Sequence, residues 1–128
     1  MSLANHHSSA FRRISLHLAR EAEHPNGDAR DRYVLVAPLQ ADGRIDQRLW
    51  RDHRDHCRVV HDDGEDTLVG HLMHGPGGRW SIRYDVSGES TDEEIFHFSD
   101  EQLRVGEYVS IIRERSAHPF RVVAVMPL

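Results

Sequence analysis

The chain has 128 residues, of which 38% are hydrophobic and 29% are charged, and its formal net charge is −5 with neutral histidines. This length suits one domain that buries roughly two thirds of its unfolded surface, and the negative charge argues against broad nucleic-acid binding, which requires phosphates to be neutralised. The sequence has no apolar run that could span a membrane and no signal-peptide pattern, and its single cysteine, Cys57, fits a reducing cytoplasm.

Residues 11–23 fit two periodicities. Ile14, Leu16 and Leu18 alternate with polar or small neighbours as in a strand, whereas Ile14, Leu18 and Ala22 also lie at helical spacing. The sequence Pro-Asn-Gly that follows indicates a turn, and residues 32–39 then read as a clear strand. Because strand–turn–strand is the simpler unit, we favour a strand for the first segment.

A short helix is predicted next. Asp46 can cap its N-terminus, and the helix would run through about Cys57. One stripe of this helix carries mainly apolar side chains, namely Ile45, Leu49, Trp50, His53 and Cys57. A short apolar piece at 58–60 and an acidic turn at 62–66 follow.

The stretch from 67 to 86 predicts a β-hairpin around the loop Gly75-Pro76-Gly77-Gly78. If these four residues form the loop, Met73 faces Trp80 and His71 faces Ile82. The predicted core face then consists of Val69, His71, Met73, Trp80, Ile82, Tyr84 and Val86. A second acidic loop at 87–94 and a short strand at 95–98 come next.

The C-terminal part predicts a single helical turn at 99–102 and two strands, 107–113 and 120–126, around a loop that holds His118 and Pro119. Both faces of this last hairpin are largely apolar, which favours a cover by the helix or by a second copy of the chain.

The elements together predict a mainly β (α+β) fold, a small antiparallel six- or seven-stranded barrel or rolled sheet with one short helix. Closing the sheet removes edges that invite aggregation. We expect the helix over one mouth of the barrel or against the face with Leu68 and Leu72. Residues 1–10 are predicted to be a flexible segment before a single β-rich domain at 11–128.

Three residues of the predicted hairpin core suggest a small-molecule pocket: His71, Trp80 and Tyr84. One polar group among apolar walls is the usual composition of such sites. Alternatively, His71 is a buried histidine whose ring is satisfied by the Tyr84 hydroxyl, backbone or water.

A second candidate is a transition-metal site, with zinc or nickel as the candidate metals. His53, His56 and Cys57 would point from one side of the predicted helix, and His61 follows after a turn. The competing interpretation is that His53 and Cys57 belong to the packing stripe. The carboxylate clusters at 62–66 and 92–94 lack the calcium-loop pattern and read as solvated turns.

A third candidate is an anion or partner face on the outer side of the helix. Its residues are Arg44, Arg48, Arg51 and Arg58. Asp52 and Asp55 are interleaved and cancel part of this charge, so a solvated helix face is the competing interpretation. No aromatic RNA-binding motif accompanies the arginines, although small barrels can bind oligonucleotides.

The chain resembles a group of small uncharacterised bacterial proteins to which no activity is attached. The similarity rests on turns and strands over most of the chain: 12–20, 36–39, 53–57, 75–78, 106–111 and 120–123. It implies a single intact domain and adds nothing about a substrate. The sequence also contains no nucleophile elbow, phosphate loop, dinucleotide fingerprint or zinc-protease helix.

We therefore predict a non-enzymatic cytoplasmic binding or accessory module that forms a homo-oligomer or binds a protein partner or small ligand, without a cofactor. The alternative is a histidine-based transition-metal-binding protein or metalloenzyme. A second alternative is a nucleic-acid-binding small barrel.

Overall fold

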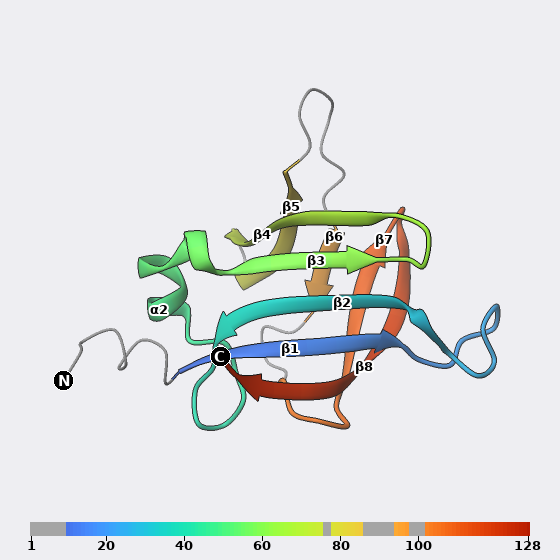
Figure 1. Ribbon diagram of the computed structural model, residues 1–128, viewed down its shortest axis with the longest axis horizontal. Helices are drawn as coiled ribbons and strands as arrows, with labels where there is room; N and C mark the ends of the chain where they lie inside the picture. Colours follow the sequence, from blue (N-terminus) through green and yellow to red (C-terminus); the bar gives the residue numbers. More distant parts are fainter. Residues whose placement is uncertain (1–9, 76–77, 86–93, 98–101) are drawn as a thin grey trace.

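Eight antiparallel strands form a closed barrel in the part of the chain that the structure, a computed structural model, describes: residues 10–75, 78–85, 94–97 and 102–128 (Figure 1). The strands are β1 (Phe11–Leu18), β2 (Asp28–Pro38), β3 (Arg58–Asp62), β4 (Thr67–Gly75), β5 (Arg79–Tyr84), β6 (Glu94–His97), β7 (Tyr108–Arg113) and β8 (Ser116–Pro127). Helix α2 (Gln47–Asp52) and the 3₁₀ turn η1 (Arg54–His56) separate β2 from β3. Each strand pairs with the next along the chain, and β8 pairs with β1 to close the barrel.

The predicted fold class is confirmed, and so is the strand at the start of the domain. One strand more is present than the six or seven predicted, because the piece after the helix extends to Asp62 and pairs with both β2 and β4. Its alternation is regular, since Val59 and His61 are buried between outward-facing neighbours. Within the described residues, no helix is long and apolar enough to cross a membrane.

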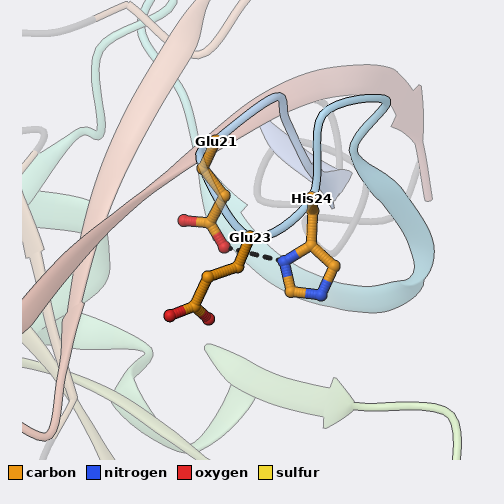
Figure 2. A group of neighbouring side chains, drawn as sticks. All are labelled: Glu21, Glu23 and His24. Atoms are coloured by element: carbon orange, nitrogen blue, oxygen red, sulfur yellow. Dashed lines mark hydrogen bonds and ion pairs between the residues drawn. The ribbon is translucent and has the colours of Figure 1, made fainter.

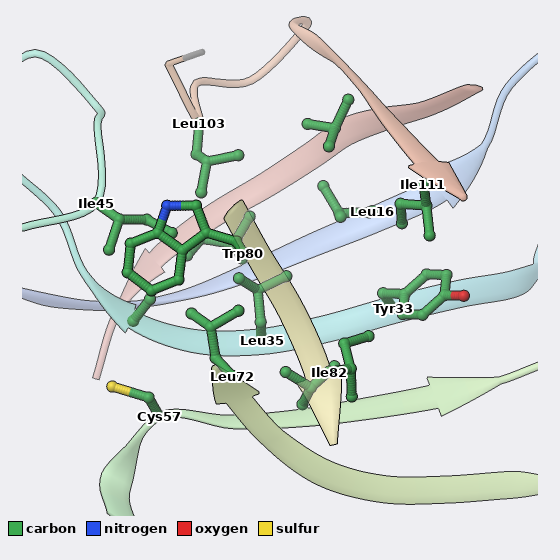
Figure 3. Packing of buried hydrophobic residues seen from close by; sticks show 14 of the residues in the cluster. Leu16, Tyr33, Leu35, Ile45, Cys57, Leu72, Trp80, Ile82, Leu103 and Ile111 are labelled. Atoms are coloured by element: carbon green, nitrogen blue, oxygen red, sulfur yellow. The ribbon is translucent and has the colours of Figure 1, made fainter. Parts of the chain in front are cut away.

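The barrel interior is filled by the inward-facing residues of successive strands (Figure 3). An eight-stranded barrel is just wide enough for side chains to fill it. The largest side chains that are almost completely buried are Tyr33, Phe120, Ile14, Leu16, Leu35, Leu72, Ile82, Leu103, Ile111 and Val59. This core fixes the positions of the two barrel ends, where the polar side chains described below lie.

Helix α2 covers one end of the barrel. The predicted cap is confirmed, because Asp46 Oδ1 accepts a hydrogen bond from the backbone N–H of Leu49 at 3.1 Å. Trp50 is only 4% exposed, its indole N–H donates to the carbonyl of Leu72 at 2.9 Å, and its ring meets that of Trp80 edge-on at 5.3 Å. The helix is thus fixed to the barrel by one large side chain.

The helix is shorter than predicted, because it ends at Asp52 and not near Cys57. His53 already has non-helical backbone angles and caps the helix, and η1 turns the chain into β3. Asp and His are weak helix formers, and β3 requires Cys57 to point into the core, where it is fully buried. His53, His56 and Cys57 therefore do not share one helical face.

The predicted register of the β4–β5 hairpin is wrong by one residue on β4. Gly75 pairs with Arg79, so His74 lies opposite Trp80 and Gly70 opposite Tyr84. A slip of one residue exchanges the two faces of a strand. Consequently Gly70 and Leu72 are buried against the core, and the odd-numbered Val69, His71 and Met73 face outward. The prediction for β5 holds, since Trp80, Ile82 and Tyr84 are buried.

Gly70 shows why this register is selected. A Cβ atom at Gly70 would lie 2.4 Å from the carbonyl oxygen of Arg83 and 2.9 Å from the Cα of Tyr84. Real Cβ atoms do not approach backbone that closely, so the inward position opposite Tyr84 accepts only glycine. Leu72, the next inward residue, is fully buried.

The prediction of a loop at His118 and Pro119 is also wrong. Glu114 and Arg115 form a two-residue turn with φ values of 49° and 68°, as in the hairpin turns that match strand twist. Strand β8 therefore begins at Ser116, and His118 and Pro119 pair with Ile111 and Ser110. The acidic loop at 87–94 and the helical turn at 99–102 fall largely outside the described residues.

Candidate functional site

An open groove lies between α2–η1 and the outer face of β4 and β5, and its volume is about 570 Å³. Its lining residues are Arg51, Asp52, His53, Arg54, Asp55, His56, His71, Met73 and Arg83. Such a volume falls within the usual range of roughly 300–1,000 Å³ for small-molecule sites. The lining is mainly polar, which favours a charged ligand over an apolar one.

The local fold explains how these side chains meet. Because α2 ends at Asp52 and η1 follows at once, residues 51–56 present arginine, histidine and aspartate side chains to solvent beside the barrel. The observed register of the hairpin places His71 directly opposite Arg83, and both face outward. The groove is therefore a product of the two features that the sequence analysis misassigned.

Among the described residues that line the groove, positive charge exceeds negative charge. Three arginines line it against two aspartates, Asp52 and Asp55. Among the described residues, Arg51, Arg54 and Arg83 have no ion pair with an acidic side chain. The Arg54 guanidinium lies 5.5 Å from the centroid of the Trp50 ring, a contact that orients its donors. These arginines can therefore offer their N–H groups to a ligand.

Asp85 sits at the edge of the groove and holds two neighbours. Its carboxylate accepts a hydrogen bond from His71 Nδ1 at 3.0 Å and lies 3.6 Å from Arg58. Asp85 thereby fixes the His71 ring and neutralises the charge of Arg58. The positive charge of the groove therefore comes from the three arginines that line it.

Of the four arginines of the predicted anion face, only Arg51 lines the groove. Arg44 pairs with Asp42 at 2.6 Å, Arg58 pairs with Asp85, and Arg48 is exposed on α2 outside the lining. Arg83 was not a candidate, because only the correct hairpin register shows that it faces the same side as His71.

The four predicted metal ligands are not brought together. His53 and His56 line the groove with ring centroids 6.0 Å apart, and His53 meets the Phe11 ring edge-on. Cys57 is buried in the core. His61 points into the opposite end of the barrel, where its Nε2 lies 2.8 Å from Asp31.

Cys57 is placed for packing rather than for reaction. Its thiol donates to the carbonyl of His53 at 3.5 Å, and burial raises its pKa to about 12. Because the thiolate is the nucleophile and the metal ligand, we expect native Cys57 to react with an aromatic disulfide reagent at pH 8 at least a hundredfold more slowly than in denaturant. Reaction of the native protein at the denatured rate would show that the thiol is accessible.

The three predicted pocket residues do not line one cavity. Trp80 and Tyr84 are 4% and 5% exposed on the inner face of β5, whereas His71 lies on the outer side of β4. The ring of Trp80 instead packs against His74, with centroids 4.3 Å apart. Among the described residues, the buried histidine is His61, which stacks on Tyr33 at 4.1 Å.

A polar network closes the barrel end opposite α2, and the sequence analysis did not anticipate it. Arg113 of β7 reaches Asp31 of β2 with Nη1–oxygen distances of 3.0 and 3.2 Å, and Asp31 also holds His61 of β3. Burial alone would raise the pKa of Asp31, but the hydrogen bond with His61 and the charge of Arg113 outweigh it and keep the pKa below its ordinary value. The network links three strands and stabilises the barrel end.

Comparison of the chain with protein-family models, with curated proteins and with solved structures gives no match.

Proposed function

We propose that the protein is a non-enzymatic binding module that holds a small anionic ligand, such as a polyphosphate or a phosphate ester, in the groove between α2–η1 and β4–β5. The observation that carries this proposal is the convergence of Arg51, Arg54 and Arg83, which have no acidic partner among the described residues, on one open groove.

The chemistry of arginine supports an anionic ligand. The guanidinium group presents a rigid fork of N–H donors that matches phosphate and carboxylate oxygens. Two of the three arginines are held in position, since Arg54 packs against Trp50 and Arg83 belongs to a paired strand. Histidines at 53, 56 and 71 add further N–H donors along the same groove.

Binding is favoured over catalysis because the one thiol of the chain is buried and its pKa is raised. Nucleophilic catalysis by cysteine needs an accessible thiolate. Among the described residues, the Cys57 thiol contacts the backbone carbonyl of His53 and not a histidine ring, so it has no base beside it.

The proposal is tested by calorimetric titration of the chain with tripolyphosphate at low ionic strength. We expect Arg54→Ala and Arg83→Ala each to weaken binding about fivefold, which corresponds to roughly 1 kcal/mol for one exposed charge-assisted contact. Binding should weaken further as salt is raised, because exposed charges are screened.

Arg48→Ala is the matched control, because Arg48 is exposed on the same helix but does not line the groove. We expect this variant to bind as the native chain does. An equal loss in Arg48→Ala, or unchanged binding in an Arg54→Ala/Arg83→Ala double variant, would contradict a site in the groove.

A further inference from the structure

Three side chains of types that can bind a metal ion gather on the loop between β1 and β2 (Figure 2). This loop lies at the barrel end opposite α2 (Figure 1). One donor atom each from Glu21, Glu23 and His24 lies within 4.8 Å of the other two. This set contains an imidazole nitrogen as well as carboxylate oxygens, which distinguishes it from an ordinary acidic surface.

Backbone hydrogen bonds in the loop fix the positions from which these side chains project. Glu21 and His24 exchange backbone hydrogen bonds of 3.0 Å across a two-residue turn, so their side chains lie next to each other. The loop is tied to β8 by a hydrogen bond of 2.8 Å from Ala19 N–H to the carbonyl of Pro119. Sites built on fixed backbone lose less entropy when they bind a ligand.

A second imidazole reaches the same carboxylate from a different strand. His118 Nδ1 of β8 lies 2.9 Å from Oε1 of Glu21, and His24 Nδ1 lies 3.0 Å from Oε2. The Glu21 side chain is 14% exposed, so this carboxylate is largely enclosed. His118 thus holds one oxygen of Glu21, while the other oxygen contacts His24, itself a member of the donor set. Carboxylates that bind metal ions are commonly oriented by hydrogen bonds from such neighbours.

We propose that Glu21, Glu23 and His24 form a site for a divalent transition metal, with zinc as the favoured ion and His118 as the residue that positions Glu21. Zinc binds histidine nitrogen and carboxylate oxygen at about 2.0–2.2 Å, which puts tetrahedral donors roughly 3.3 Å apart. Glu23 is exposed and His24 is 39% exposed, so both side chains have room to reach that spacing.

The test uses the full, untagged chain and equilibrium dialysis against Zn²⁺, with the visible absorption of bound Co²⁺ as a second readout. We expect one site, and we expect Glu23→Gln and His24→Ala each to weaken Zn²⁺ binding at least tenfold and to remove the Co²⁺ absorption of that site. Both positions are partly or fully exposed, so neither variant should fail to fold. His118→Gln should weaken binding about tenfold, as loss of an orienting partner does.

The chain has other histidines, and they provide the controls. His56→Ala, in the groove, and replacement of the adjacent pair His6 and His7 should leave the site intact. Loss of Zn²⁺ binding in either control, unchanged binding in Glu23→Gln and His24→Ala, or no binding by the native chain would overturn the proposal. Because the groove is separate, His24→Ala should still bind tripolyphosphate, so the two proposals fail independently.

Discussion

Replacing Trp50 by alanine is expected to lower the free energy of unfolding by about 3–5 kcal/mol, the usual cost of removing a buried tryptophan. The indole is 4% exposed, packs against Trp80, and donates to the backbone of Leu72. Its removal leaves a cavity between α2 and the barrel and an unpaired carbonyl on β4. Urea unfolding followed by circular dichroism measures the change.

Two variants separate the contributions to this effect. Trp50→Phe retains a ring but removes the indole donor, so we expect this variant to lower the free energy of unfolding by about 1–2 kcal/mol. Arg51→Ala, on the exposed side of the same helix, should change the free energy of unfolding by less than about 0.5 kcal/mol. A loss below about 1 kcal/mol in Trp50→Ala would show that the helix does not depend on this side chain.

Replacing Asp31 by alanine is expected to cost about 2–4 kcal/mol at neutral pH, because the variant leaves Arg113 and His61 in the barrel end without their shared carboxylate. The Asp31 and Arg113 side chains are only 15% and 18% exposed, so water replaces little of the lost interaction. Chemical unfolding of the variant and the native chain measures the difference.

The contribution of Asp31 should also depend on pH. Its pKa is lower in the folded chain than in the unfolded chain, so its stabilisation is complete above the ordinary carboxyl pKa of about 3.9 and is lost as the pH falls through the lowered value. Asp31→Asn keeps the shape of the side chain but removes this titration. We expect its stability to fall less steeply than that of the native chain below about pH 4, and an identical acid slope in both would contradict the role given to Asp31.

The sequence was sufficient to predict the fold class, because alternation in β1, β2, β5 and β7 and the capping aspartate of α2 are local signals. It was not sufficient for the register of β4. Both faces of that strand contain apolar side chains, so hydrophobicity does not choose between them, and the glycine-rich loop fits either three or four residues. Only Gly70, which packs against the backbone of the opposite strand, distinguishes the two registers.

The candidate sites depended on contacts that sequence spacing does not reveal. Arg113 lies 82 residues from Asp31 and 52 from His61, yet the closed barrel brings them together. His118 and Glu21 are 97 residues apart. The groove likewise requires that α2 ends sooner than predicted. The packing of Cys57 and β3, and not helix propensity, sets that end.

Amide chemical shifts of the ¹⁵N-labelled chain, followed during titration with tripolyphosphate, show whether an anionic ligand binds in the groove. We expect the largest changes at residues 51–56, 71–73 and 83, and we expect them to saturate together. At the same ligand concentrations they should be much smaller in the Arg54→Ala/Arg83→Ala variant. Changes concentrated on arginines elsewhere, such as Arg30 and Arg121, or spread evenly over the surface without saturation, would contradict binding in the groove.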